Sequence, residues 1–242
     1  MKTFSIITAV YNGEKFVENC IKAILNTNYD LNLIEHIIVD DGSTDNTKKI
    51  CEEYAKKYSH IKFYSKPNGN WGSVINFVKN NKLASNDYIV VCDADDMLVK
   101  TAFRTINEKC KDEDLFASSF YLWNGKSKKI KITPYFFLFK KHFVKKDLWN
   151  YHSSLIIPAS GWIKKEIFYS IPDLKEKVSY QDTVLFTHAF LKAKKSFEKQ
   201  WKNINKQYAT EEKDAKEKAD EDQVADGKKE NVGASACGIQ PA

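Results

Sequence analysis

Three carboxylates follow directly after a run of mostly apolar residues in the stretch DYIVVCDADDMLVK, residues 87–100. Residues 88–92 have the length and composition of a buried strand, and Asp93, Asp95 and Asp96 come immediately after it. Carboxylates gathered at the end of a buried strand repel one another and raise one another's pKa unless a cation or donor groups hold them. The spacing therefore predicts a site at which a cation or a set of hydrogen-bond donors is bound.

Apolar runs of strand length alternate with segments of helical periodicity through the first hundred residues. Strands are expected at 4–10, 33–39, 61–64 and 88–92, and helices at 14–26, 44–58 and 72–81. This alternating order predicts a doubly wound α/β sheet, mainly parallel and covered by helices. In open sheets of this kind, ligands bind beyond the carboxyl ends of the strands. We therefore look for function at the ends of the four strands.

Polar or acidic loops follow all four expected strands. They read, in order, TAVYNG, DDGSTDNT, SKPNGNWGS and DADD. Each has a plain structural alternative: Ser43 or Thr44 could cap the next helix with Asp45 near its positive end, and the glycines of NGNWG allow positive φ. Because the topology brings all four loops to one rim, we expect a binding site there.

Composition and charge exclude several classes of protein. The 242 residues are 43% apolar and 13% aromatic, which suits one sizeable folded core. The net charge is +6, which favours anionic partners such as nucleotides, but Arg104 is the only arginine, so we expect no nucleic-acid partner. The five cysteines lack paired spacing, which favours a reducing cytoplasm, and no apolar run approaches the roughly 18 residues of a membrane span.

Four stretches in this order, SIITAVYNGEKFVENCIKAIL, HIIVDDGSTDNT, KPNGNWGSVIN and YIVVCDADD, resemble the nucleotide-sugar-binding half of family 2 glycosyltransferases. The resemblance covers residues 3–100 and implies the GT-A fold, a Rossmann-like α/β domain with a mixed, mainly parallel sheet flanked by helices. It implies an inverting transfer of a sugar from a nucleotide-diphosphate sugar, with a UDP-sugar favoured, to a hydroxyl of a glycan or lipid-linked glycan. In this family the Asp-x-Asp element binds Mn²⁺ or Mg²⁺ beside the diphosphate.

The resemblance also implies roles for individual residues. Asp95 is the expected metal ligand, Asp93 a second ligand or a ribose contact, and Asp96 an acceptor-side contact. Tyr11 is expected to lie against the base, and Asp40 or Asp41 to accept the N3 hydrogen of uracil. The residues expected to bind the nucleotide are Thr8, Ala9, Tyr11, Asp40, Asp41, Asn68, Gly72, Asn76, Asp93 and Ala94. Ile75 stands where the family often has arginine, so the phosphates would depend more on the metal and on Lys66.

The acceptor-binding half shows weaker similarity. PASGWIKKEIF resembles the family's acceptor-facing segment, with Gly161 as a turn and Trp162 as an aromatic platform for a sugar. In SYQDTVLFTHAF, Asp182 at the start of a helix resembles the family's catalytic base, which takes the proton from the acceptor hydroxyl. Core packing is the competing role for Trp162 and Tyr11, and helix capping for Asp182.

We expect three parts in the chain: a nucleotide-sugar-binding half at 1–100, an acceptor-binding half of the same domain at 101–193, and a helical and then disordered tail at 194–242. The protein is expected in the cytoplasm, and the basic, aromatic segment 128–149 raises the alternative of peripheral contact with the inner face of the cell membrane. Two other functions remain open. A metal-dependent nucleotidyltransferase would carry a Gly-rich basic loop that TAVYNG lacks, and a non-catalytic nucleotide-sugar-binding or scaffolding module would bind the donor without turnover.

Overall fold

The computed structural model describes residues 1–118, 120–123, 129–132 and 158–193. Strands and helices alternate along the first part of the chain, as the sequence predicts. In chain order the elements are β1 (Phe4–Val10), α1 (Val17–Leu25), a 3₁₀ turn (Leu31–Leu33), β2 (Ile34–Asp40), α2 (Thr47–Lys57), β3 (Ile61–Ser65), α3 (Asn70–Asn80), β4 (Tyr88–Val91), α4 (Ala102–Lys109), β5 (Leu115–Ala117), β6 (Phe120–Trp123), β7 (Lys129–Ile132), β8 (Gly161–Lys164), α5 (Lys165–Ser170) and α6 (Gln181–Lys192).

The main sheet has six strands in the order β3-β2-β1-β4-β8-β5. The first four strands are parallel, and β8 runs antiparallel to both of its neighbours. β6 and β7 form a separate antiparallel pair. The expected mixed, mainly parallel sheet is confirmed. Strand order reverses between β1 and β4, and such a switch point is where a crevice opens at the carboxyl ends of the strands.

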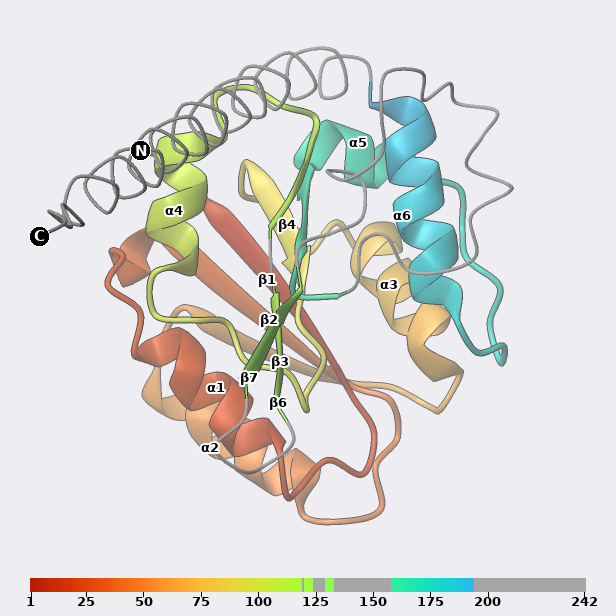
Figure 1. Cartoon of the computed structure of the whole chain (residues 1–242). Coiled ribbons are helices and arrows are strands. Elements are labelled where there is room, and N and C mark those ends of the chain that lie inside the picture. Colours follow the sequence, from red (N-terminus) through yellow and green to blue (C-terminus); the bar gives the residue numbers. More distant parts are fainter. Residues whose placement is uncertain (119, 124–128, 133–157, 194–242) are drawn as a thin grey trace, which may run out of the picture. The chain divides into compact units, whose positions relative to one another are not determined.

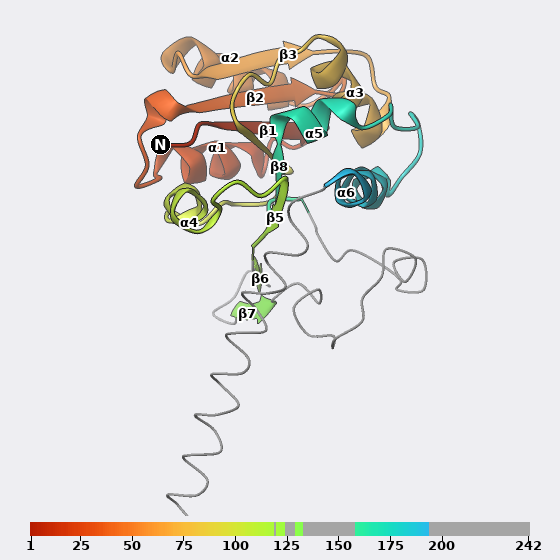
Figure 2. The same cartoon turned by 90° about the horizontal axis from the view of Figure 1, so that it is seen from above.

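Helices cover both faces of the sheet. Figure 1 shows α1, α2 and α4 on one face and α3, α5 and α6 on the other, and Figure 2 shows the strands following one another from β3 at one edge to β5 at the other. Every residue of β2 and β4 is buried, as parallel strands covered on both faces require. The strands β2 and β4, whose ends carry part of the site, are therefore packed on both faces.

The observed element bounds agree closely with the sequence for the strands and less well for the helices. β1 has the expected bounds, but α1 begins three residues later than expected, because the Gly13 carbonyl accepts hydrogen bonds from the amides of Phe16 and Val17 in a turn before the helix. The tail expected at 194–242 and most of segment 128–149 lie outside the described residues. Within the described part of the chain, no helix is both long and apolar enough to cross a membrane.

Two expectations for the acceptor half are wrong. Gly161 is not a turn but the first residue of β8, and the turn lies earlier, where Ala159 has a φ of 65°. Trp162 is not an exposed platform, because its side chain is only 1% exposed. Its ring packs edge-on against Phe4 and Phe103, with centroid distances of 5.5 and 5.6 Å. Since alternate residues of a strand face opposite sides, placing residue 162 in β8 turns its ring into the core.

Trp162→Ala is expected to lower the free energy of unfolding by about 3–5 kcal/mol, because it leaves a large cavity between Phe4 and Phe103. Phe16→Ala is the matched control, since the Phe16 ring is 51% exposed and should cost little. Urea unfolding of the three proteins measures both changes. Equal stability of the two variants would contradict the placement of Trp162 in the core.

Candidate active site

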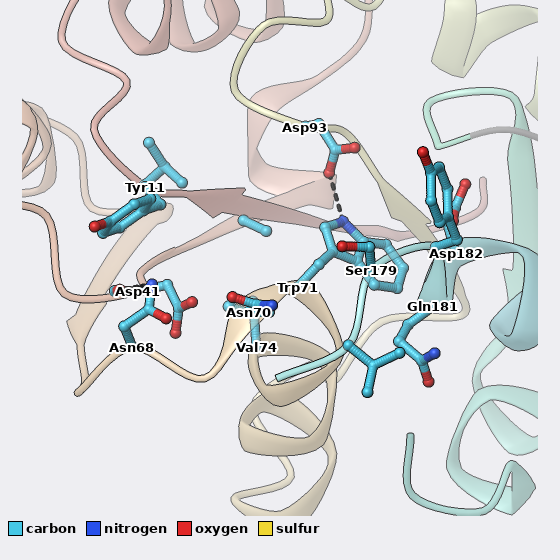
Figure 3. Close-up of a pocket in the computed structure, with 14 residues that line it drawn as sticks. Tyr11, Asp41, Asn68, Asn70, Trp71, Val74, Asp93, Ser179, Gln181 and Asp182 are labelled. Atoms are coloured by element: carbon cyan, nitrogen blue, oxygen red, sulfur yellow. Dashed lines mark hydrogen bonds between the residues drawn. The ribbon is translucent and has the colours of Figure 1, made fainter. Parts of the chain in front are cut away.

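A pocket of about 490 Å³ lies at the carboxyl ends of β1, β2 and β4 (Figure 3). Its lining comes from the end of β1, the loops after β1, β2, β3 and β4, the first turns of α3, and the segment that leads into α6. The lining residues are Ala9, Val10, Tyr11, Asp41, Asn68, Asn70, Trp71, Val74, Asp93, Val178, Ser179, Tyr180, Gln181 and Asp182. Six of the residues expected from the sequence are among them: Ala9, Tyr11, Asp41, Asn68, Asp93 and Asp182.

The loops after β1 and β2 are tied to each other by side chains. The Asn12 amide donates to the Ser43 hydroxyl at 2.8 Å, and the Asn12 side-chain oxygen accepts from the Thr44 amide at 2.8 Å. Asp45, rather than Ser43 or Thr44, accepts the amide of Thr47 at the start of α2. The DGSTD turn therefore fixes the rim next to Tyr11 as well as capping a helix.

Tyr11, Asp41 and Asn68 form one end of the pocket (Figure 3). The Tyr11 side chain is 54% exposed, so its ring is open to a ligand. Of the two acids considered for the base, only Asp41 lines the pocket. The Asp40 carboxylate is buried and accepts hydrogen bonds from the Ser43 amide and the Ser65 hydroxyl.

Lys66 holds the Asp41 carboxylate instead of projecting toward the pocket. Its Nζ forms an ion pair with Asp41 and donates to the Ser73 hydroxyl at 2.7 Å. The Gly69 amide donates to both Asp41 oxygens, at 3.1 and 3.2 Å. Because the Lys66 ammonium is largely buried, it needs a charged partner and pairs with the nearby Asp41 carboxylate. Lys66 therefore orients Asp41 and is not a free cation for phosphates, contrary to the expectation from the sequence.

Asp93 lies at the centre of an acidic cluster. The Trp71 indole Nε1 donates to one Asp93 carboxylate oxygen at 2.7 Å (Figure 3). The Asp96 amide donates to the Asp93 carbonyl oxygen at 2.9 Å, which closes a tight turn and keeps Asp95 and Asp96 within electrostatic range of Asp93. This turn is the local reason why the sequence DADD becomes a cluster.

The electrostatics of this cluster disfavour negative charge. Burial raises the pKa of Asp93 to about 7. The hydrogen bond from Trp71 opposes this shift, whereas the charges of Asp96, Asp95 and Asp182 add to it. Burial, followed by the charge of Asp95, raises the pKa of Asp96 to about 6. Without a cation, these carboxyl groups cannot all be ionised comfortably at neutral pH.

Asp182 faces the pocket from the first turn of α6, at the end opposite Tyr11 (Figure 3). The positive end of the helix dipole favours its carboxylate there. Asp93 and Asp182, from distant parts of the sequence, line the same pocket, and the charge of Asp182 adds to the raised pKa of Asp93.

Segment 171–181 brings Asp182 to this position by docking on α3. Asn76 donates to the Leu174 carbonyl at 2.9 Å and accepts from the Leu174 amide at 2.8 Å. A Cβ on Gly72 would lie 2.6 Å from the Lys175 carbonyl oxygen, so only glycine allows this approach. The Lys79 ammonium donates to the Ile171 carbonyl at 2.6 Å, one turn further along.

Five residues expected to bind the nucleotide do not line the pocket. Thr8 faces the opposite side of β1 from Ala9 and bonds His36 Nε2 at 2.9 Å. Ala94 packs in the core beneath the turn. Asp40 stabilises the loop after β2, and Gly72 and Asn76 dock segment 171–181. These residues hold the walls of the pocket and are not among the residues that line it. Asp95 and Asp96 lie in the turn beside the pocket and not among its lining residues.

Several pocket residues were not predicted from the sequence. Trp71 could have been predicted as a site residue, since it is an aromatic residue inside the polar loop NGNWGS. Residues 178–181 were not predicted because they reach the pocket through the docking of their segment on α3, a long-range contact that the sequence does not indicate. Tyr180 stands out among them, with a φ of 61° and a side chain that is 85% exposed.

The chemistry of the donor set fits a hard divalent cation. Oxygen ligands are what Mg²⁺ and Mn²⁺ prefer, and the crowded carboxyl groups of Asp93, Asp95 and Asp96 would be relieved by positive charge. Among the described residues no three His, Cys, Asp or Glu side chains form a ready-made metal cage. A cation here would thus need oxygen ligands from a bound molecule in addition to those of the protein.

The raised pKa of Asp93 predicts a pH dependence of stability in the metal-free protein. Between its ordinary value of 3.8 and about 7, the folded state keeps a proton that the unfolded state has lost. The protonated Asp93 carboxyl therefore contributes its full stabilisation of the folded state below pH 3.8, and this contribution is lost as pH rises through about 7. Relative to Asp93→Asn, which cannot ionise, the wild type should lose at least about 1 kcal/mol between pH 5 and pH 8.

Thermal unfolding in a chelating buffer measures this loss. Glu53→Gln, at an exposed position of α2, is the control, and the stability difference between it and the wild type should change less with pH. A stability difference between wild type and Asp93→Asn that does not change with pH would show that the Asp93 pKa is not raised.

Asn76→Ala is expected to lower the free energy of unfolding by about 2–5 kcal/mol, because it leaves the amide and carbonyl of Leu174 buried without their partner. Asn81→Ala, at the C-cap of the same helix, is the matched control, since the Asn81 side chain makes an exposed hydrogen bond to the Phe77 carbonyl. Denaturant unfolding gives both values. If the two variants lose the same small amount, the docking contact is not the anchor described above.

Comparison with known proteins agrees with this geometry. A family model described as glycosyl transferase family 2 matches residues 5–171. An uncharacterized glycosyltransferase of Mycoplasma pneumoniae is 37% identical over 194 residues, which cover 80% of this chain and 64% of that protein. The chain thus matches less than two thirds of that relative's length.

Solved structures show the same fold. S. aureus TarS in complex with UDP-GlcNAc matches with a TM-score of 0.62 and 21% identity, over 79% of this chain and 54% of that chain. A mannosyltransferase from Pyrobaculum calidifontis, in complex with GDP-Man and Mn²⁺, matches with a TM-score of 0.55 and 14% identity, over 78% and 52%. These similarities do not favour a nucleotidyltransferase or a scaffolding module. The chain belongs to glycosyl transferase family 2, and its fold is the GT-A fold.

Proposed function

We propose that this protein is an inverting, metal-dependent glycosyltransferase that moves a sugar from a UDP-sugar to a hydroxyl group of a glycan or lipid-linked glycan. The observation that supports it best is the polarity of one pocket: an open aromatic ring beside a fixed carboxylate at one end, and a cluster of acids at the other (Figure 3). A nucleotide-sugar has the matching order of base, diphosphate and sugar.

The Tyr11 end suits a uracil base. The Tyr11 ring offers an exposed face for stacking, and Asp41 offers carboxylate oxygens that can accept the N3 hydrogen. Lys66 and Gly69 orient that carboxylate before a ligand arrives, which reduces the cost of ordering it on binding. The UDP-GlcNAc complex of TarS, which shares the fold, is consistent with a uridine donor.

Asp95 and Asp93 would hold Mn²⁺ or Mg²⁺, whose remaining ligands would be oxygens of the donor diphosphate. The bound cation would neutralise the charge that develops on the leaving diphosphate. The Mn²⁺ in the mannosyltransferase of the same fold supports this assignment. Within the protein, Trp71 fixes one oxygen of Asp93 and leaves the other free to face the ligand.

Asp182 is the proposed general base. In an inverting transfer, the acceptor hydroxyl attacks the anomeric carbon from the face opposite the leaving diphosphate and gives its proton to a carboxylate. Asp182 lies at the end of the pocket away from Tyr11, beyond Asp93 (Figure 3). The carbon–oxygen bond to the diphosphate breaks as the new glycosidic bond forms, and Asp182 keeps the proton.

The donor assignment predicts binding of UDP in preference to GDP, with affinity that depends on Mn²⁺. Asp95→Ala should abolish the Mn²⁺-dependent part, because it removes one of the two proposed metal ligands, whereas Glu53→Ala, an exposed acid on α2, should leave it intact. Isothermal calorimetry with UDP, GDP and dTDP, with and without Mn²⁺, measures this. Tighter binding of GDP, or equal binding by Asp95→Ala, would contradict the proposal.

The base assignment predicts that Asp182→Asn retains UDP binding but loses sugar transfer by about 10²–10⁴-fold. Thr183→Ala, at the next and exposed position of α6, is the control and should transfer at the rate of the wild type. Transfer from radiolabelled UDP-sugars to a mixture of glycan acceptors gives the rates. Binding of UDP without transfer by the wild type would instead favour a non-catalytic donor-binding module.

A further inference from the structure

Tyr180 combines three features that a packing role does not explain. Its side chain is 85% exposed, the highest value among the large hydrophobic residues exposed in the described part of the chain. It lines the pocket, directly before Gln181 and Asp182 at the start of α6. Its φ of 61° lies in the left-handed region, which is unfavourable for a residue with a Cβ.

The surrounding contacts force this conformation. The Lys175 amide donates to the Gln181 side-chain oxygen at 3.0 Å, and the Lys177 amide donates to the Gly69 carbonyl at 2.8 Å. Together with the docking of Leu174 on Asn76, these bonds hold both ends of a short loop against α3. A strained residue that its neighbours hold in place at the mouth of a pocket is typical of a functional position. Glycine would relieve the strain, so the aromatic side chain has another use.

We propose that Tyr180, together with Val178, forms the platform on which a pyranose ring of the acceptor stacks. This inference rests on the proposed function, since it assigns the acceptor of the same site. The two side chains are 85% and 44% exposed and line the same cavity as Asp182. An acceptor ring lying on Tyr180 would thus lie beside the carboxylate that takes its hydroxyl proton.

The chemistry of the lining favours a sugar over a lipid chain. A pyranose ring has an apolar face of C–H groups, which suits an aromatic ring, and an edge of hydroxyl groups, which needs polar partners. Around Tyr180 the cavity offers such partners in Ser179 and Asp182. An acyl chain would leave these groups without hydrogen bonds, which is costly. Trp162, the platform expected from the sequence, is buried and cannot serve.

Saturation-transfer NMR with n-octyl β-D-glucoside below its critical micelle concentration tests this platform, because one probe carries both a pyranose ring and an alkyl chain. Spectra are recorded with and without UDP and Mg²⁺, which is diamagnetic. The wild type should saturate the ring protons more than the chain protons. Tyr180→Gly should weaken glucoside binding by about tenfold, whereas Tyr180→Phe should bind as the wild type does.

Lys177→Gly is the matched control. Lys177 also has a positive φ, 56°, in the same loop, but it does not line the pocket. Both glycine variants should be at least as stable as the wild type, so a loss of binding confined to Tyr180→Gly cannot come from unfolding. Saturation mainly of the alkyl chain, no binding by the wild type, or equal binding by Tyr180→Gly would overturn the proposal. Because UDP binding is measured separately on the same samples, failure of the donor site is distinguishable from failure of the platform.

Discussion

The hydrogen bonds between the Asn76 side chain and the backbone of Leu174 are the contact on which the site depends most. They join residues 98 positions apart in the chain and satisfy both polar groups of one buried residue. Gly72 allows the same segment to approach α3 closely. Through this docking, Asp182 faces Asp93 across one pocket. The two halves of the chain, which also share one sheet through β4 and β8, meet at the point where the chemistry is proposed.

At the acidic end of the pocket, carboxyl groups lie where negative charge is unfavourable. Asp93 and Asp96 are buried enough to resist ionisation, and among the described residues the Trp71 indole, which bonds Asp93, is the one side-chain donor to either carboxyl group. Natural proteins keep such crowded acids where a ligand compensates them. Lys66, the nearest candidate for compensation in the third loop, is committed to Asp41 at the other end. Among the described residues no ion pair reaches Asp93 or Asp96, so in the proposed function a bound cation would supply the positive charge at the acidic end and link metal binding to donor binding.

Local sequence patterns predicted the sheet because parallel buried strands are continuous apolar runs, and they located the site because such strands end at one rim. Side-chain direction was harder to predict. Thr8 and Trp162 point away from the pocket because of strand alternation, which a family resemblance does not resolve. The roles of Asn76 and Tyr180 depend on a contact with a distant segment, and no local pattern reports it. For the same reason, the sequence did not predict that β8 pairs antiparallel between β4 and β5.

Diffraction from crystals grown with UDP and Mn²⁺, with anomalous data collected at the manganese edge, is the most direct test of the proposed donor site. We expect one manganese peak at ligand distance from an Asp95 carboxylate oxygen and from diphosphate oxygens, with uracil against Tyr11 and the terminal phosphate directed toward Asp182. A nucleotide bound in the reverse direction, or manganese bound away from Asp93 and Asp95, would contradict it.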